Sequence, residues 1–532
     1  MSSSENEDAA QSNRAAIPRH SQLPAQSSHL SVTVPRLSAR KWIVVIVVAA
    51  FVIGAAAVYT VPTFVFSRQN VAQALGDAVS GEARFDSFHN VYFPHPGCVA
   101  EGVTIRRSTD VRAPLIAASK LIIVGNYSTI FSKHVAVMKA EGLQITPSGG
   151  QWPESRSKSS IVIDRFVADD AVLEADGSRN LRFLVHHFAI GDLGSKAPMV
   201  FEVHLSNPLP PGEITAGGKL GPWHPQHGDT AVEGSYSFRN ADLGAIQGIG
   251  GILSSDGNFK GTIDNLDVTG TTDTPEFEVK TNQHRFPLST SFQAKVNAAN
   301  GDVILKHVTA KLRETELAVQ GTVLPDPQQH RRTAALDVHA QNGRIQDVLF
   351  PFVNARRSPL NGETSWRAHI VLPSGHEPFR RRVSLEGDFG ITDARFTNPR
   401  MQANLDKASV SARGKPEDDD PADVLSDLKG HVALKDGTAT FSHLSFAVPG
   451  ALAQLHGTYN LVNKRVDLHG IVQMQAKVSD ATTGVKSFLL KALSPFIKKN
   501  KPASPLPVAI TGTYDHPQYS ISITKKQERR GM

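Results

Sequence analysis

Residues 455–478 read LHGTYNLVNKRVDLHGIVQMQAKV, and this stretch decides the fold class. From Val466 onward, apolar residues recur at every second position, with Gly470 in the same register. The residues between them are polar apart from one isoleucine. A period of two predicts a strand that buries one face. The residues before the polar tip at 463–464 alternate in the same way, so the stretch is predicted to form a β-hairpin.

A second hairpin is predicted over Ser291–Leu312. Phe292, Ala294 and Val296 would lie on one face, and Asn300-Gly301 supplies the residues that tight turns with positive φ require. The alternation resumes at many other points of the chain, which indicates a sheet built from successive hairpins.

A short motif recurs in which an apolar residue, any residue, glycine, a small or polar residue and an apolar residue follow one another. A glycine inside a strand usually marks a bulge or a strong bend, which would help a sheet curl. The alternative is that this motif is merely favourable chemistry for starting a strand. Its six copies have their glycines at Gly234, Gly261, Gly321, Gly387, Gly457 and Gly512.

One segment is suited to a membrane. Trp42–Val61 reads WIVVIVVAAFVIGAAAVYTV, twenty residues without a charge. As a helix it would cover about 30 Å, the thickness of the hydrocarbon core of a bilayer. Pro62 is expected to end this helix. A cleaved signal peptide is the alternative, but its apolar part would be unusually long and its leading region far too long.

Basic residues indicate the orientation of this helix. Arg36, Arg40 and Lys41 precede it, whereas only Arg68 follows closely. The excess of basic residues on the cytoplasmic side of membrane proteins therefore predicts a cytoplasmic N-terminus and an exported bulk.

The 471 residues after Val61 allow about 25–30 strands and a sheet on the order of 100 Å long. An open sheet of that length must curl to cover its apolar face. We therefore expect a mostly β fold. One N-terminal transmembrane helix would be followed by a long, curled, largely antiparallel and groove-like β-sheet with a few short amphipathic helices.

The expected organisation has four parts. These are a disordered cytoplasmic tail (1–41), the transmembrane anchor (42–61), an exported β-groove region (62–523) and a basic tail (524–532). The tail is rich in Ser, Ala and Gln and lacks hydrophobic periodicity.

Three short helices are expected. One begins at Asn70, which would cap it, and ends at Gly81. A second is expected within Asn240–Gly257, whose apolar residues have helical spacing. The third, Asp480–Lys499, is apolar on one side and Lys-rich on the other. It would either plug the end of the sheet or lie on an anionic membrane surface, and both alternatives stay open.

Two regions are expected to be loops because proline, glycine or acidic residues dominate them. The first is Asn207–Thr230, which contains NPLPPG and GPWHPQHGD. The second is Gly414–Asp423, GKPEDDDPAD.

Composition argues against several functions. The net charge is +6 with acids and bases interspersed, so no nucleic-acid partner is expected. The one cysteine, Cys98, is expected to be a small buried apolar residue. His186-His187 and the group His224, His227 and Asp229 lack a further ligand at useful spacing. We therefore expect no catalytic residue, no metal and no cofactor, and we expect that the protein is not an enzyme.

Several stretches resemble the AsmA-like family of bacterial envelope proteins, which are related to bridge-like lipid transfer proteins. These stretches are FPHPG (93–97) before CVAEGVTI, KAEGLQITP (139–147), GIGGILSSDGNFKGTIDNLDVTGTTDTPEFEV (248–279), and the run from GTYNL (457–461) to PVAITGTYDHP (507–517). The resemblance spans most of residues 42–523, and residues 455–523 are similar to the C-terminal region of AsmA-like proteins.

The resemblance implies a single-pass protein of the inner (cytoplasmic) membrane with its bulk in the periplasm. It also implies that phospholipid is carried or shielded in an apolar β-groove, in support of transport to the outer membrane and its maintenance. It supplies no catalytic residues. Outer-membrane or other envelope proteins are further candidate partners.

The candidate lipid-groove residues are those whose alternation places them on the apolar side: Phe292, Val296, Leu468, Val472 and Met474. The same face could instead pack on another layer of the protein. The alternative function is a non-enzymatic scaffold or assembly factor for outer-membrane proteins, in which the trough would be filled by its own side chains.

Overall fold

The structure is a computed structural model. It describes residues 39–521 except 80, 108–114, 130–131, 133, 147–160, 176–180, 225, 247, 281–283, 326–331, 353–357, 376, 414–423, 475–504 and 514–515. The chain divides into two compact units, Met1–Val58 and Tyr59–Met532. The expected tails, the acidic loop Gly414–Asp423 and the amphipathic stretch Asp480–Lys499 lie outside the described residues or almost entirely so.

The expected apolar helix is present as α1 (Ala39–Val65). It is long and apolar enough to cross a membrane, with a mean hydropathy of 2.0 over its most apolar window. Large side chains such as Phe51 are mostly exposed to the surroundings, as expected for a helix that faces lipid.

The expected end of this helix was wrong. Pro62 lies inside α1, and the helix continues to Val65. The peptide N–H of Phe66 still donates to the Pro62 oxygen at 2.8 Å. Proline removes only its own N–H donor and strains the preceding turn, so it is tolerated where the helix is held by packing. The side chain of Pro62 is fully buried.

The next helix, α2 (Arg68–Val79), begins earlier than expected. Ser67, and not Asn70, precedes its first turn, and the Asn70 N–H donates to Ser67 Oγ at 3.3 Å. Ser67 therefore supplies the capping oxygen at the start of α2, a role that the sequence predicted for Asn70. The side chain of Asn70 instead donates to the Phe64 oxygen at 2.8 Å.

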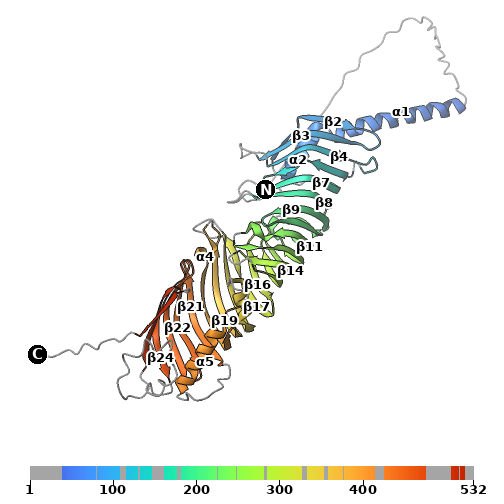
Figure 1. The fold of residues 1–532 in the computed structure, drawn as a ribbon. Helices are drawn as coiled ribbons and strands as arrows, with labels where there is room; N and C mark the ends of the chain where they lie inside the picture. The colour runs from blue at the N-terminus through green and yellow to red at the C-terminus, as the bar shows by residue number, and fades with distance from the viewer. Residues whose placement is uncertain are drawn as a thin grey trace, which may run out of the picture. The chain divides into compact units, whose positions relative to one another are not determined.

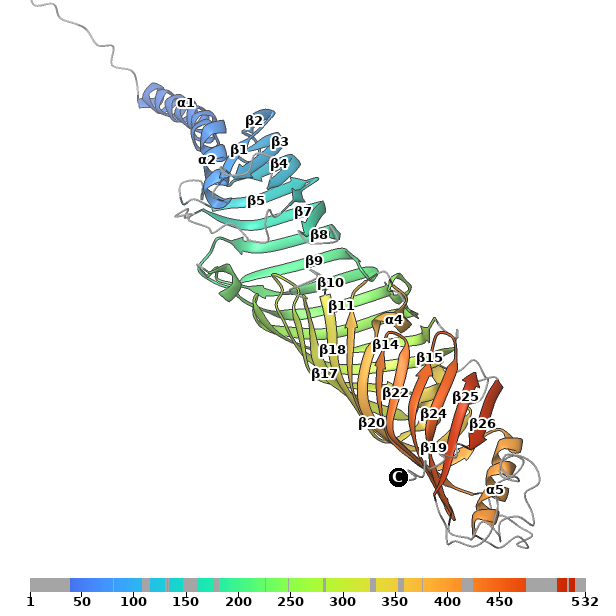
Figure 2. The same ribbon diagram turned by 90° about the vertical axis from the view of Figure 1, so that its left-hand side faces the viewer.

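The described strands form one sheet of 26 strands, within the expected range (Figures 1 and 2). From β7 onward the pairing is antiparallel and joins neighbours in sequence, except that the two-residue β12 pairs with β14. The pairings β5–β7 and β6–β7 are parallel. The expected fold class is thus confirmed: one long apolar helix and a large, curled, largely antiparallel sheet.

The first half of the sheet has thirteen strands, here with their bounds: β1 Gly81–Arg84, β2 Ser87–Val91, β3 Gly97–Arg107, β4 Ile116–Val124, β5 His134–Glu141, β6 Gln144–Ile145, β7 Val162–Ala175, β8 Leu181–Leu193, β9 Met199–Pro208, β10 Pro211–Leu220, β11 Ala231–Asp242, β12 Ile249–Gly250 and β13 Ile252–Thr262.

The second half has thirteen more: β14 Asn265–Val279, β15 Arg285–Val296, β16 Val303–Leu312, β17 Thr315–Pro325, β18 Arg332–Arg344, β19 Leu360–Pro373, β20 Ser384–Phe396, β21 Ser426–Lys435, β22 Thr438–Val448, β23 Ala451–Asn460, β24 Arg465–Met474, β25 Leu506–Thr513 and β26 His516–Ile521.

Short helices interrupt the strands: η2 His227–Asp229, η3 Leu243–Ala245, α3 Ile345–Leu349, η4 Phe350–Phe352, α4 Phe379–Arg382 and α5 Pro399–Arg413.

Both predicted hairpins are confirmed. Strands β23 and β24 pair with Tyr459 opposite Val466, around the tip that contains Lys464 in a positive-φ conformation. Strands β15 and β16 pair with Val296 opposite Val303, and Gly301 has a φ of 77° in the turn.

The expected long loop over Asn207–Thr230 was wrong in its first half, whereas the described residues of 221–230 form a loop with the 3₁₀ turn η2. Its first half is strand β10, which pairs with both β9 and β11. Ile214 and Leu220 of β10 lie on the apolar side, but Ala216 and Gly218 stand between them, so the period of two gives little hydrophobic signal in the middle of the strand. Pro211 is the first residue of β10, a position where a strand tolerates proline.

The expected helix within Asn240–Gly257 was also wrong. Its described residues contain only one 3₁₀ turn, η3, and Asp242 Oδ1 caps it by accepting from the Gly244 N–H at 2.7 Å. Gly248 and Gly251 have φ values of 98° and 120°, which no helix contains. Most of the other described residues of the segment belong to the end of β11, to β12 and to β13.

The six motif glycines all lie within strands, on β11, β13, β17, β20, β23 and β25. Gly321 and Gly457 have φ values of 153° and 144°. The strand opposite each of them carries a register shift, between Leu305 and Val308 and between Phe441 and Leu444. The expected bulge beside a motif glycine is therefore confirmed at these two positions.

Candidate functional site

The register of the sheet defines a row of paired residues that crosses it from β2 to β25, here called the central row. Residues paired across neighbouring strands point to the same face. None of the row's members is charged: Phe88, Ala100, Leu121, Ala140, Ala168, Phe188, Val203, Ala216, Tyr236, Gly257, Gly270, Phe292, Val308, Val319, Val338, Ala368, Gly387, Val432, Phe441, Gly457, Leu468 and Ile510.

A neighbouring row on the same face, here called the second row, is equally free of charge: Cys98, Ile123, Met138, Phe166, Ile190, Phe201, Gly218, Gly234, Phe259, Val268, Ala294, Leu305, Gly321, Leu336, Ile370, Leu385, Leu434, Ala439, Tyr459, Val466 and Gly512. We call the face that carries both rows the apolar face.

Aromatic rings lie over glycines on this face. A Cβ placed on Gly270 would lie 2.9 Å from the hydroxyl of Tyr236 and 3.1 Å from Cζ of Phe292. The rings therefore fill the space that a side chain would occupy, and they cover backbone that would otherwise be open to solvent. This contact also confirms that residues two strands apart in the central row share one face.

The opposite face is polar. Cross-strand pairs there join histidine to a carboxylate, with Nδ1–Oδ1 distances of 2.8 Å for His369–Asp337 and 2.9 Å for His431–Asp388. Hydrogen bonds from His187 and Lys139 hold the pKa of Asp169 below its usual value. The sheet thus separates an apolar face from a charged one along its length.

From β9 onward most members of the two rows are half-buried, while Ala294, Val338, Ala368 and Ala439 are buried. Phe292, Phe441 and Leu468 are half-buried, although they belong to an apolar row in the middle of the sheet. The large cluster of buried residues involves α2 and the strands up to β8, and a smaller one surrounds Ile345 in α3. Among the described residues, no second layer covers the face from β9 to β25 as fully as α2 covers its beginning.

The structure places all five sequence-predicted residues on the apolar face. Phe292 and Leu468 belong to the central row, on β15 and β24. Val296 lies in a further row with Leu266 and Val303. Val472 and Met474 pair with Ala453 and Ala451. All five are half-buried, and they are spread over ten strands, so they mark one continuous surface and no compact pocket. Their contact with lipid stays a prediction.

The two long edges of this surface differ. Because the strands are antiparallel, alternate connections lie at the same edge. One edge, here called the turn rim, carries mainly short connections such as those between β13 and β14, β15 and β16, and β23 and β24. The other, here called the insertion rim, carries η3, α3, η4 and α5.

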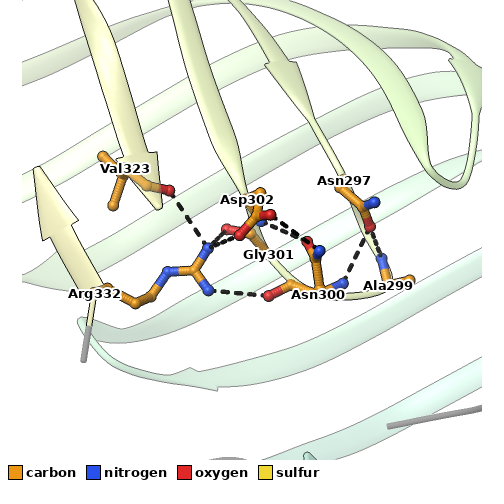
Figure 3. A network of polar contacts seen from close by, with 7 residues as sticks. All are labelled: Asn297, Ala299, Asn300, Gly301, Asp302, Val323 and Arg332. Carbon is orange, nitrogen blue, oxygen red and sulfur yellow. Dashed lines mark hydrogen bonds and ion pairs between the residues drawn. The ribbon is translucent and has the colours of Figure 1, made fainter. Parts of the chain in front are cut away.

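At the turn rim, Arg332 fastens two hairpins together (Figure 3). Its guanidinium donates to the oxygens of Asn300 at 3.0 Å and of Gly301, and it pairs with Asp302 Oδ1 at 2.9 Å. The same group donates to the Val323 oxygen at 3.4 Å. One side chain from β18 thereby holds the β15–β16 turn beside the end of β17.

At the insertion rim, η4 folds toward the apolar face. The ring of Phe350 lies 6.0 Å from that of Phe286, which is buried on β15. The guanidinium of Arg313 lies 4.5 Å from the centre of the Phe350 ring and pairs with the buried Asp347 at 3.1 Å. This rim is therefore walled by the protein's own helices and rings.

The histidines considered as metal ligands in the sequence were compared with the acidic side chains around them in the described part of the chain. No group of three or more His, Cys, Asp or Glu that could hold a metal occurs among the residues that the structure describes. His186 approaches Ser206 Oγ at 2.7 Å, while His187 pairs with Asp169 at 2.8 Å. His224 lies 3.8 Å from Asp229. His186 and His187 thus contact polar partners on the sheet, and His224 contacts one in a turn.

Cys98 has the environment of a small apolar residue, as expected. Its side chain is 1% exposed, and burial raises the pKa of its thiol to about 12. A thiol that stays protonated at neutral pH is a poor nucleophile.

Sequence reasoning missed most members of the two rows. Glycine and alanine make up much of the central row, and they give no hydrophobic signal. Trp366 was also missed; it lies beside the central row, pairs with Phe389, and its indole nitrogen is buried without a hydrogen-bond partner. In the sequence, only the alternating apolar residues two positions away along the same strand could have indicated that these residues share the apolar face.

Comparison with known proteins identifies no relative: no protein-family model, no curated protein and no solved structure matches this chain.

Proposed function

We propose that this protein is anchored in the inner membrane by α1 and carries or shields phospholipid acyl chains on the apolar face of its periplasmic sheet. The observation that best supports this proposal is the pair of uncharged rows. They continue through more than twenty strands, while the opposite face of the sheet is charged. Half-buried apolar side chains in such a row would gain about 25 cal/mol for each Å² that an acyl chain covers.

The chain's other features support this proposal. The apolar helix brings the sheet to a lipid source, and the basic residues before it favour an exported sheet. An acyl chain needs no hydrogen-bond partner, so a surface without polar groups suits it, while its headgroup needs water and would remain at a rim. Involvement in transport to the outer membrane rests on the AsmA-like resemblance alone.

The test compares matched lysine substitutions on the two faces of one strand. Phe292→Lys places a charge on the apolar face, and Gln293→Lys places the same charge on the exposed polar face. We expect the full-length Phe292→Lys protein to retain several-fold less co-purifying phospholipid than the Gln293→Lys protein, measured by lipid mass spectrometry. The lipid around α1 is common to both proteins, so their difference reports on the sheet.

A second pair, Val472→Lys and Gln473→Lys, repeats the comparison on β24. Unfolding curves for all four variants show whether each remains folded. Equal lipid content in folded members of both pairs would remove the support for lipid binding. It would favour the scaffold alternative, in which the sheet holds other envelope proteins.

A further inference from the structure

The apolar face is not equally accessible along its length. Over β3 to β7, the central-row residues Ala100, Leu121, Ala140 and Ala168 are between 0% and 5% exposed. Further along, Val203 and Phe292 are half-buried in the same row. Alanines of the two rows are buried in both parts, as Ala294, Ala368 and Ala439 are, and Val338 is also buried. The difference lies in the large side chains, because Leu121 and Ile123 are 5% and 4% exposed whereas Val203 and Phe292 are half-buried.

The protein's own helices fill the first part. Val71 of α2 is 7% exposed and belongs to one buried cluster with Leu121 and Ala140. Leu75 of α2 and Val65 at the end of α1 pack against the same cluster. Figure 2 shows α2 beside the first strands of the sheet.

The junction of the two helices closes this region further. Phe66, between α1 and α2, is 5% exposed. A Cβ placed on Gly125 would lie 2.8 Å from Cζ of the Phe66 ring, so the ring fills the space beside this glycine. The aliphatic side chains of β3 to β5 are therefore already desolvated by α2 and the helix junction, so an acyl chain has little surface to gain over them. Phe88 and Phe166 border this region and stay half-buried.

We propose that the acyl-chain site begins at β9 and ends at β25, and that the face over β3 to β7 is excluded from it. This inference rests on the proposed function and sets the limits of its site. With the two-residue β12 left aside, β9 to β25 comprise 16 strands. At ~4.8 Å per strand, the open face is about 75 Å long.

This length suits several lipids. One leaflet of a bilayer is about 15 Å deep, half of the ~30 Å hydrocarbon core, so the open face exceeds the length of a single acyl chain several times. Because the α2 end of the face is filled, acyl chains do not slide in from that end.

Photocrosslinking at phenylalanines tests these limits. A benzoylphenylalanine at Phe292 or Phe441 lies on the open part, whereas one at Phe88 or Phe166 lies on the filled part. Phe88 is the matched control for Phe292, because both are half-buried members of the central row. The crosslinker at Gln293 controls for the polar face. The full-length protein is illuminated with vesicles of phosphatidylethanolamine and phosphatidylglycerol, and adducts are identified by mass spectrometry.

We expect lipid adducts at positions 292 and 441, at yields several-fold above those at 88, 166 and 293. Equal yields at 88, 166 and 292 would show that lipid reaches the filled part, and would overturn this inference while the proposed function stands. No lipid adduct at any position would contradict the proposed function itself. Adducts at 441 with the chain's own residues 475–504 would show that a protein segment occupies the far part, and would overturn the limit at β25.

Discussion

At the scale of single residues, glycine sets how closely neighbouring strands approach. Gly457 has a φ of 144°, and a Cβ there would collide with the backbone oxygen of Asp467 on β24. Gly390 has no such constraint, since its nearest atom would be the Ser365 oxygen at 3.8 Å. The two glycines therefore differ in whether a side chain fits.

We expect Gly457→Ala to lower the free energy of unfolding by about 1–3 kcal/mol, because alanine is strained at this φ and the strands must separate. Gly390→Ala is the control and should change stability by less than about 1 kcal/mol. Urea unfolding of both proteins measures the difference. Equal stabilities would mean that the sheet relaxes around the added methyl group.

The buried thiol of Cys98 is expected to be unreactive while the protein is folded. Its pKa is raised from the model-compound value of 9.0 to about 12, because burial disfavours the thiolate. Iodoacetamide at pH 8 should therefore modify Cys98 only after denaturation, as read by mass spectrometry.

The same shift links stability to pH. Below pH 9 the thiol is protonated in both the folded and the unfolded chain, so its contribution is constant. Between pH 9 and 12 only the unfolded chain loses this proton, so stability should fall as the pH rises. Cys98→Ala should lose less stability over that interval; an identical pH profile would exclude Cys98 as a source of the effect.

At the scale of elements, α2 is the piece that distinguishes the filled part of the apolar face from the open part. Its Val71 is buried against the sheet, whereas Gln73 on the same helix is exposed. A lysine at Val71 would both add a charge and remove packing against the sheet, whereas a lysine at Gln73 would add the charge alone.

We expect Val71→Lys to cost about 2–3 kcal/mol, because the ammonium group cannot be buried without a partner. Hydrogen exchange should then increase in β3 and β4, which α2 covers. Gln73→Lys should leave exchange in these strands unchanged. Similar exchange in the two variants would show that α2 contributes little to covering the face.

At the scale of the whole molecule, the period of two was sufficient to predict the fold class. It succeeded where large apolar residues alternate, as in the hairpin that contains Val466. It failed in β10, where Ala216 and Gly218 occupy the apolar positions between Ile214 and Leu220. It also failed before β13, where apolar residues at helical spacing are separated by glycines with positive φ. Local spacing cannot show which conformation a glycine adopts.

The candidate site was predicted in part. Alternation placed Phe292, Leu468 and the other three residues on one face, because each strand orients its own side chains. The continuity of the two rows depends on how strands pair, and the filling of the first strands depends on α2, which contacts them only after folding. Those features are long-range and left no local pattern in the sequence.

The pairing of neighbours in sequence has a consequence for how the chain folds. From β7 onward, nearly every strand finds its partner within the next connection, so the loop-closure entropy of each step is small. A chain that emerges from a membrane N-terminus first could add one hairpin at a time to the edge already formed, much as repeat proteins grow by nearest-neighbour contacts. The strand order of the sheet is thus also an order in which it could be assembled.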